Sequence, residues 1–472
     1  MEISEYVRHD ATGLRELLAK GEVTAAEVED AARAALDRAD AELNALALPP
    51  FEPALAHDAA GPFAGVPFLI KDIGPMAEGV PFFAGSRALD GLGIVAPYDR
   101  DLMRRFRAAG LVTLGLTTAP ELALSLVSES PKYGVTRNPW DLGRDPGGSS
   151  SGAAALVAAR AVPVAHGGDG AGSLRVPAAA CGLVGLKPSR GRIPCGPDMG
   201  EPMFGMVGEF ALTRTVRDAA RLLDAVHGAG VGDKCAAPPP RRPYAEEIVT
   251  GPGRLRVAVM TRAWSGTPVA PEVAAVAEHA ARALEAAGHH VTEAGPALSW
   301  EAVLHGMLTQ SVANGASFLL APREPHPDTV AATTRSLLAQ IKRTTALDLL
   351  RGFRSQNEVT RAAARFFLDH DVLVTPTTAR PPLPHGTLDY DAEGQTMRDW
   401  LVKLDGYSPF TMAFNVSGHP AISLPLGWSA DGLPIGVQLV AAHDREDLLL
   451  GLAARLEEEI PWRDRIPPHA VG

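Results

Sequence analysis

Short apolar segments alternate with helical patterns along most of this chain, and this order limits the folds open to it. Thr24 and Glu27, for example, form a capping box at the start of a helical pattern. Strands interleaved with helices predict a layered sheet covered by helices, the α/β class. The predicted strands are 65–70, 111–115, 162–165, 255–260 and 371–376, and the predicted helices are 24–40, 99–110 (with Asp99 as its cap), 152–160, 215–227, 271–288 and 444–459.

Two segments near the end of the chain predict that this sheet is mixed. Residues 421–426 and 433–440 are rich in strand-forming residues, and Ala430-Asp431-Gly432 lies between them. Such a pattern predicts a hairpin, in which the two strands run antiparallel. The sheet is therefore expected to contain antiparallel pairs and not to be purely parallel.

The segment 233–254, with three consecutive prolines at 238–240, predicts a loop or linker. It precedes a helix-rich region, 255–370, expected on the substrate side of the molecule. The long helical stretch at 301–369 in this region is predicted to break between Pro322 and Pro327. We see no internal repeat in the sequence.

Composition excludes several classes of protein. The formal net charge of −11 argues against a nucleic-acid partner, which would need a basic face. No apolar run reaches the roughly 18 residues of a membrane span, and the first ten residues lack signal-peptide order. Cys181, Cys195 and Cys235 are an odd number without metal-ligand spacing. We therefore expect a cytoplasmic protein with no membrane partner.

Two glycine-rich segments carry the candidate chemistry. Gly147 to Gly152 contains three serines, and Gly170 to Ser173 ends on a fourth. Lys71 follows a predicted buried strand, and a desolvated lysine can lose its proton where arginine cannot. Lys71 is thus a candidate base, or alternatively a lysine whose charged end snorkels to solvent. A nucleophile, a proton shuttle, a base and free backbone N–H groups are what amide cleavage needs without a histidine or a metal.

The serines at 149–151 also match the motif of a different class of hydrolase. Gly148 to Gly152 matches the Gly-x-Ser-x-Gly nucleophile elbow of α/β-hydrolases, with Ser150 as the nucleophile. That elbow needs a buried strand before it, whereas residues 140–146 read as a polar loop. The oxyanion loop should also precede the nucleophile, and the similar His166-Gly167-Gly168 follows it. Either segment alone would read as a glycine- and serine-rich loop without chemistry.

Taken together, the motifs resemble the amidase signature family along nearly the whole chain. This resemblance implies a single domain over 1–472 with a large, mixed, twisted sheet covered on both faces by helices. Within the family, residues 138–144, 164–167, 185–193 and 414–450 are most similar to amidases acting on nylon oligomers. The motifs that carry the resemblance are GVPFLIKD (65–72), NPWD (138–141), GGSS (147–150), DGAGSLRVPA (169–178), CGLVGLKP (181–188) and FNVSGHPAISLP (414–425).

The resemblance implies a serine mechanism that proceeds through an acyl-enzyme. Ser173 would be the nucleophile, Lys71 the base, and Ser149, in a cis peptide with Ser150, the relay between them. A base working at neutral pH requires a lysine pKa about three units below its usual value, which burial could supply. The remaining implied site residues are the oxyanion-hole donors Gly170, Ala171 and Gly172, joined by the Ser173 N–H, and the supporting residues Ser150, Asp169 and Arg175.

Some positions are ambiguous or depart from the family pattern. Asp72 is expected to be a structural hydrogen-bond acceptor, and Asp169 with Arg175 a structural ion pair beneath the loop. Ser151 and Ala171 stand where the family commonly has glycine. Because alanine tolerates positive φ poorly, Ala171 could reshape the oxyanion hole.

Substrate choice stays open at this stage. The pocket walls are expected from residues 121–131, 195–210 and 300–320, with an apolar entrance formed by Met199, Met203, Phe204, Met206 and Phe210. Oligoamides, aryl amides and esters are all compatible with such walls. Two alternatives remain: the glutaminase subunit of a tRNA-dependent amidotransferase, and an inactive relative acting as a binding module. The resemblance implies no cofactor and no metal, and it admits a homodimer.

Overall fold

The computed structural model describes residues 1–91, 93–321 and 323–472, and its centre is a ten-stranded sheet. The sheet is parallel at both ends and antiparallel in the middle, so the predicted mixed sheet is confirmed. In spatial order the strands are β4 (Val112–Thr117), β1 (Pro67–Lys71), β5 (Val164–Asp169), β7 (Gly208–Thr213), β6 (Val184–Lys187), β11 (Ala421–Trp428), β12 (Pro434–Ala441), β10 (Val372–Pro376), β8 (Arg256–Val259) and β9 (His290–Glu293). A separate small hairpin pairs β2 (Pro81–Phe82) with β3 (Ile94–Val95).

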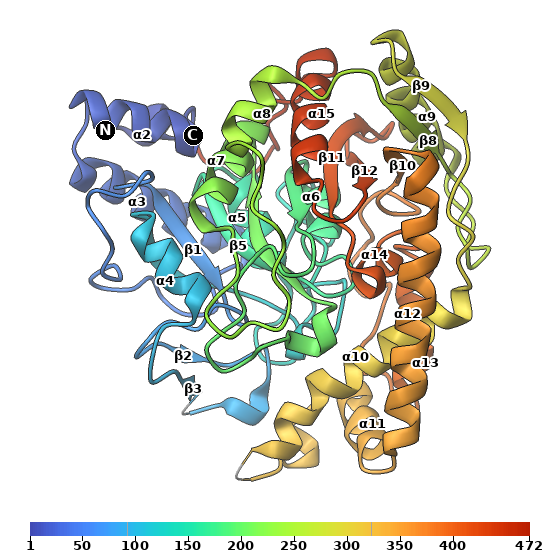
Figure 1. Cartoon of the computed structure of the whole chain (residues 1–472). Helices are drawn as coiled ribbons and strands as arrows, with labels where there is room; N and C mark the ends of the chain where they lie inside the picture. The colour runs from blue at the N-terminus through green and yellow to red at the C-terminus, as the bar shows by residue number, and fades with distance from the viewer. Residues whose placement is uncertain (92, 322) are drawn as a thin grey trace.

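Helices cover both faces of this sheet (Figure 1). The third of them, α3, begins at the predicted capping box, in which Thr24 and Glu27 satisfy each other's backbone N–H groups. The helices are α1 (Ile3–Tyr6), α2 (Ala11–Lys20), α3 (Ala25–Leu43), α4 (Asp101–Ala108), α5 (Ser151–Ala158), α6 (Arg175–Cys181), α7 (Val216–Val226), α8 (Tyr244–Thr250), α9 (Pro271–Ala286), α10 (Trp300–Leu320), α11 (Ala332–Ile341), α12 (Ala346–Asp369), α13 (Met397–Asp405), α14 (Met412–Ser417) and α15 (Glu446–Glu459).

Two local predictions are wrong. Asp99 does not cap α4, because its carboxylate binds the Arg107 guanidinium at 2.7 Å and accepts from the Glu78 N–H at 2.8 Å. The segment 233–254 is not wholly a loop, because it contains α8. The carboxylate of Asp224 accepts from the N–H groups of Tyr244 and Ala245 at 2.7 and 2.9 Å and so starts this helix.

The helix-rich region expected at 255–370 holds α9 to α12 together with β8 and β9. The predicted break in the long helix is present, since α10 ends at Leu320 and α11 begins at Ala332; Pro322 itself lies outside the described residues. A second break separates α11 from α12, where Thr345 and Asp348 form a new capping box. Helices α10 to α13 gather at one end of the molecule (Figure 1) and contribute to an apolar cluster that also includes residues of α6 and α14.

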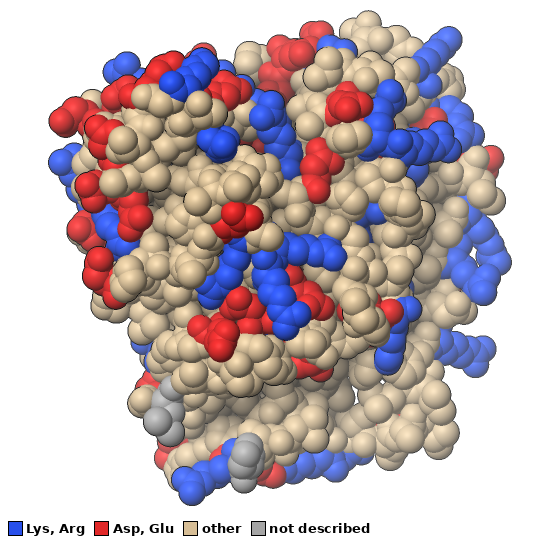
Figure 2. Space-filling view, turned by 60° about the vertical axis from the view of Figure 1, so that its left-hand side comes forward, with Lys and Arg blue, Asp and Glu red and all other residues tan. Residues whose placement is uncertain are grey.

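The two ends of the chain lie side by side, near α2 in Figure 1. The N–H of Val471 donates to the carbonyl of Ala159, and Gly472 lies against Val7. Figure 2 shows acidic and basic side chains interspersed over one face of the molecule. In the part of the chain that the structure describes, no helix is long and apolar enough to cross a membrane.

Candidate active site

Lys71 ends strand β1 and is almost fully buried. Its Nζ donates to Ser149 Oγ at 2.7 Å and lies 3.3 Å from Ser150 Oγ. Burial lowers the pKa of Lys71 to about 7, against the opposing pull of the carboxylates of Glu209, Asp169 and Asp72. The side chain is therefore held inside the protein, and the alternative of a lysine reaching solvent does not apply.

Asp72 acts as a hydrogen-bond acceptor for the loop that follows it. Its carboxylate accepts from the backbone N–H groups of Phe83 and Gly85 at 2.7 and 2.9 Å, and from the Tyr133 hydroxyl at 2.7 Å. Burial raises the pKa of Asp72 to about 6 in spite of these donors. The structural role expected for Asp72 is confirmed.

The serine segment is held in place by close backbone packing. The N–H of Gly148 donates to the Leu126 carbonyl at 2.8 Å, and a Cβ on Gly148 would lie 2.7 Å from the carbonyl oxygen of Val127. The cis peptide joins Gly148 to Ser149 and not Ser149 to Ser150, which corrects the expected position. The physical reason is that the two Cα atoms of a cis peptide lie only about 2.9 Å apart, and this crowding is least where one of them belongs to a glycine. Ser150 is the N-cap of α5, where its carbonyl accepts from the Ala154 N–H at 3.1 Å.

Asp169 and Arg175 form an ion pair in which both side chains are fully buried, with a shortest distance of 2.9 Å. Arg175 also donates to Gln438 on β12 and Asn415 on α14, both at 2.6 Å, and to the carbonyl of Thr411 at 3.0 Å. Burial alone would raise the pKa of Asp169, but the adjacent guanidinium holds that pKa well below its usual range. The pair thus ties the loop 170–174 to the sheet, as expected of a structural ion pair.

The backbone of this loop corrects one proposed oxyanion donor. The N–H of Gly172 donates to Asp169 Oδ1 at 2.8 Å, so it is not free for a substrate oxygen. Within the described residues, the N–H groups of Gly170, Ala171 and Ser173 make no hydrogen bond. Ala171 does not have a positive φ, so the expected penalty for alanine at this position does not arise.

Two side chains orient the peptide planes of the loop. Gln310 Nε2 donates to the carbonyl of Gly170 at 2.8 Å, which sets the direction of the Ala171 N–H in the same peptide plane. The Thr411 hydroxyl donates to the carbonyl of Ala171 at 2.6 Å and thereby turns the Gly172 N–H toward Asp169. The free N–H groups are therefore preorganised before any substrate arrives.

We predict that Gly172→Ala lowers kcat by about 10²-fold, because a shift of the loop at Gly172 would move the free N–H groups of its neighbours Ala171 and Ser173, and the loss of one oxyanion donor has about this effect. Gly172 has a φ of +132°, and an added Cβ would lie 2.7 Å from Thr411 Oγ1, so the loop must shift. Steady-state kinetics on any hydrolysed amide measures the change. Gly115→Ala is the matched control, because its Cβ would meet nothing closer than 3.5 Å and its φ is ordinary. Equal rates for both variants would show that the loop geometry does not matter.

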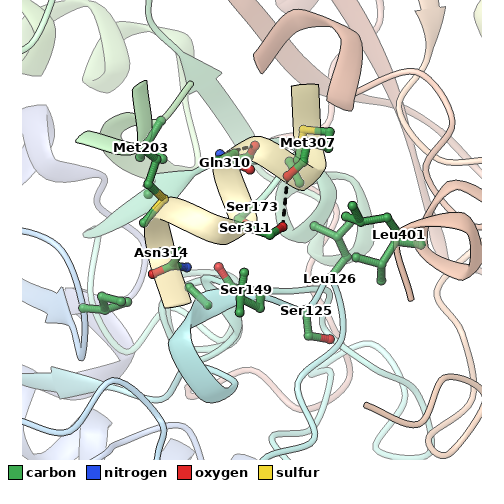
Figure 3. A pocket seen from close by; sticks show the side chains of 18 of the residues that line it. Ser125, Leu126, Ser149, Ser173, Met203, Met307, Gln310, Ser311, Asn314 and Leu401 are labelled. Carbon is green, nitrogen blue, oxygen red and sulfur yellow. Dashed lines mark hydrogen bonds between the residues drawn. The ribbon is translucent and has the colours of Figure 1, made fainter. Parts of the chain in front are cut away.

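A cavity of about 70 Å³ opens above Ser149, Ser173 and Lys71. Gln310, Ser311 and Asn314 of α10 line the same cavity as the two serines, and Figure 3 shows them in one view with Ser149 and Ser173. Met203 lies on one side of it, and Leu126 and Leu401 lie on the other. The cavity wall is mostly apolar, with one carboxylate, Glu209; its other lining residues are Ile73, Ala123, Leu124, Ser125, Gly168, Gly170, Ala171, Val207, Met307, Met397 and Leu404.

The three segments expected to form the pocket all contribute to it, and the one at 300–320 is the helix α10. Of the five residues proposed for an apolar entrance, only Met203 lines the cavity. Met206 and Phe210 do not line it, because their side chains are buried in two separate apolar clusters of the core. The contribution of α13, with Met397, Leu401 and Leu404, was not predicted, because no element was assigned between residues 376 and 421.

Ser150 does not line the cavity, which argues against the α/β-hydrolase elbow. It is fully buried, its hydroxyl donates to the carbonyl of Gly168 at 3.3 Å, and no histidine bonds to it in the described part of the chain. His166 instead lies behind Lys71. Its Nδ1 accepts from the Lys71 N–H at 3.4 Å, and its Nε2 lies 3.2 Å from Glu209 Oε2. Sequence reasoning missed this pair, because β7, which carries Glu209, was not recognised as a strand.

Glu129, Asp145 and His385 form the one group in the described residues that could hold a metal ion. His385 Nδ1 lies 3.7 Å from Glu129 and 3.8 Å from Asp145. Burial opposes protonation of His385, but the nearby carboxyl groups of Glu129 and Asp145 prevail and raise its pKa. Asp145 also accepts from the Gly147 N–H at 2.7 Å, so the cluster supports the serine segment.

Comparison with known proteins places this geometry in a family. The profile of the amidase family matches residues 14–450. The chain belongs to the amidase family. It is 41% identical to 6-aminohexanoate-cyclic-dimer hydrolase from Pseudomonas sp. (strain NK87), over 97% of this chain and 96% of the relative. It is 40% identical to the enzyme of the same name from Paenarthrobacter ureafaciens, with the same coverage.

The fold agrees with the sequence comparison. The solved structure of 6-aminohexanoate cyclic dimer hydrolase matches this amidase with a TM-score of 0.91 and 38% identity, over 98% of this chain and 99% of the other. The amidase-signature fold predicted from the motifs is confirmed. The chain is a hydrolase of carbon–nitrogen amide bonds.

Proposed function

We propose that this amidase hydrolyses aliphatic oligoamides, such as 6-aminohexanoate cyclic dimer, with Ser173, Ser149 and Lys71 as its catalytic residues. The observation that carries the proposal is the 2.7 Å contact between Lys71 Nζ and Ser149 Oγ in a cavity that Ser149 and Ser173 also line. The leucine and methionine side chains of the cavity suit methylene chains. The relatives' names supply the specific substrate.

The proposed reaction begins with attack of Ser173 Oγ on the amide carbonyl carbon. Its proton passes to Ser149 Oγ, which gives its own proton to neutral Lys71 Nζ. The tetrahedral oxyanion accepts from the free N–H groups of Gly170, Ala171 and Ser173. As the C–N bond breaks, the proton returns through Ser149 to the leaving nitrogen. Water then attacks the ester carbon while its proton passes through Ser149 to neutral Lys71. As the ester C–O bond breaks, Lys71 returns this proton through Ser149 to Ser173 Oγ, which releases the carboxylic acid and regenerates the enzyme.

The glutaminase alternative is less well supported. Glutamine carries an α-carboxylate, and a site built for it would need a cationic partner. Among the described residues that line the cavity, Lys71 is the one basic side chain, and it is already hydrogen-bonded to Ser149. Glu209, the carboxylate in the lining, would repel an α-carboxylate.

The experiment that tests the substrate class is incubation of the purified enzyme with 6-aminohexanoate cyclic dimer, hexanamide and glutamine, with products followed by mass spectrometry. We expect the ring-opened linear dimer to form from the cyclic dimer. Glutamate and ammonia formed faster than any oligoamide product would favour the glutaminase. The absence of turnover on all three would support the binding-module alternative.

We predict that EDTA leaves amide turnover unchanged, because every proton transfer in the proposed reaction uses a lysine or a serine. The carboxylates near His385 are already engaged with that side chain, as described above. Rates measured before and after dialysis against the chelator check this. A loss of activity that added zinc restores would contradict it.

For the whole protein we propose a single domain over 1–472, in the cytoplasm, free of nucleic acid and able to form a homodimer. The continuous sheet, built from strands between Pro67 and Ala441, supports one domain. Three free cysteines support a reducing compartment. The interspersed charges in Figure 2 offer no continuous basic surface on that face. Size-exclusion chromatography with light scattering reports the oligomeric state.

A further inference from the structure

Glu209 occupies an unusual place beside the catalytic cavity. It lies on β7 opposite Gly168 of β5, next to the strand end that carries Asp169. Its side chain keeps 23% of its surface exposed, and it lines both the catalytic cavity and a second cavity. Glu209 therefore stands at the boundary between the two spaces.

The carboxylate of Glu209 has no cationic partner at this boundary. His166 Nδ1 accepts a hydrogen bond from the Lys71 backbone, so the imidazole proton is on Nε2, which donates to Glu209. That arrangement is a neutral histidine. Arg100, which also lines the second cavity, is bound to Asp198 at 2.7 Å and to the Gly74 carbonyl at 2.7 Å. In the described residues the negative charge of Glu209 is thus left uncompensated whenever Lys71 is neutral and ready to act.

The second cavity is larger than the catalytic cavity. Its volume is about 230 Å³, against about 70 Å³ for the catalytic cavity. The two spaces share Ile73, Met203, Val207, Glu209 and Asn314, so they adjoin along one wall. The second is lined mainly by apolar side chains, including Phe82, Leu122, Ile193 and Met199. An aliphatic chain of several methylenes fits these walls better than a polar group does.

We propose that the second cavity receives the acyl arm of an ω-aminoacyl amide, and that Glu209 binds the protonated amine at the end of that arm. This inference rests on the proposed function, because the amide must reach Ser173. Linear oligomers of 6-aminohexanoate carry their ammonium group on the acyl side. So does the acyl-enzyme formed when the cyclic dimer opens, whose new amine stays tethered to the ester. An ammonium held by Glu209 is kept from attacking that ester, which suppresses ring closure.

The test compares matched pairs of 4-nitroanilides in the full-length enzyme. Each pair is an ω-aminoacyl anilide of four, six or eight carbons and the acyl anilide that lacks the amine. We expect wild type to favour the amine-bearing partner by about tenfold or more in kcat/KM at the best chain length. In Glu209→Gln, which keeps the hydrogen-bond contact to His166, the ratio should fall to about one. Using a ratio within each enzyme cancels any general effect of the substitution on catalysis.

Two controls make the result specific to Glu209. Glu201→Gln removes a nearby carboxylate that lines neither cavity and should leave the ratio unchanged. The mono-4-nitroanilide of adipic acid carries a negative charge at the end of the arm, so Glu209→Gln should speed its hydrolysis relative to the hexanoyl anilide. A wild-type ratio near one at every chain length, or an equal ratio in wild type and Glu209→Gln, overturns the proposal.

Binding to Ser173→Ala tests the inference without turnover. Calorimetry should show 6-aminohexanamide binding about tenfold more tightly than hexanamide, and the addition of Glu209→Gln should abolish the difference. Equal affinities in Ser173→Ala overturn the ammonium site. Failure of the proposed function looks different, because Ser173→Ala would then hydrolyse the anilides at the wild-type rate. The two ideas can therefore fail separately.

Discussion

Ser173→Ala lowers amide turnover by about 10⁴- to 10⁶-fold, the effect expected when a catalytic nucleophile is removed. The fold survives, because Ser173 Oγ makes no hydrogen bond within the described residues and alanine fits the same space. Initial rates and melting temperature measure the two effects. Ser151→Ala is the matched control. Its hydroxyl is buried without a partner, so its loss should change neither activity nor stability appreciably.

A covalent probe identifies the nucleophile independently. Treatment with a fluorophosphonate, followed by peptide mapping, should place the label on Ser173 in wild type and nowhere in Ser173→Ala. A label on Ser150 would revive the α/β-hydrolase elbow and move the search for a base to the histidines. Undiminished amide turnover by Ser173→Ala would remove this serine from the mechanism altogether.

Lys71→Met lowers kcat by about 10²- to 10⁴-fold, the usual contribution of a positioned base. In wild type the base must be neutral, and its pKa is about 7. We therefore expect kcat/KM to fall about tenfold per pH unit below 7 and to level off above it. Asp72, with a pKa of about 6, titrates in the same range, so Asp72→Asn is the control. If the pH profile of kcat/KM in Lys71→Met still changed slope near pH 7, the lysine would be ruled out as the group that titrates there.

The same lysine should destabilise the folded protein. Between pH 7 and 10.5 the unfolded chain binds a proton on Lys71 that the folded chain lacks, so stability rises as the pH rises through this window. The difference between the folded and unfolded pKa of Lys71 lowers the free energy of unfolding by roughly 5 kcal/mol at pH 7 and below. Lys71→Met should therefore melt no lower than wild type at pH 7, and its advantage should shrink toward pH 10. A lower melting temperature at pH 7 would contradict the buried, neutral lysine.

Local patterns in the sequence were sufficient for much of the fold. Thr24 with Glu27 pins a helix start by contacts within one turn, and the turn at 430–432 brings two adjacent strands together. Such interactions join residues close in sequence, so they can be read without the tertiary structure. Asp99 and Asp224 show the limit of this reasoning. Their carboxylates look alike in sequence, yet Asp99 binds a guanidinium, and Asp224 starts a helix twenty residues away.

The sequence by itself determined the amidase motifs and the residue types for the chemistry: Lys71 after a strand, and serines among glycines. Only the tertiary structure decided how they act. Burial lowers the pKa of Lys71, and the Asp169 carboxylate accepts the hydrogen bond of the Gly172 N–H. Gln310, 140 positions further along the chain, donates to the Gly170 carbonyl and so orients that peptide. The position of Glu209 between two cavities likewise depends on strand pairing. Desolvation and hydrogen-bond partnership depend on neighbours distant in sequence, and these are known only once the chain has folded.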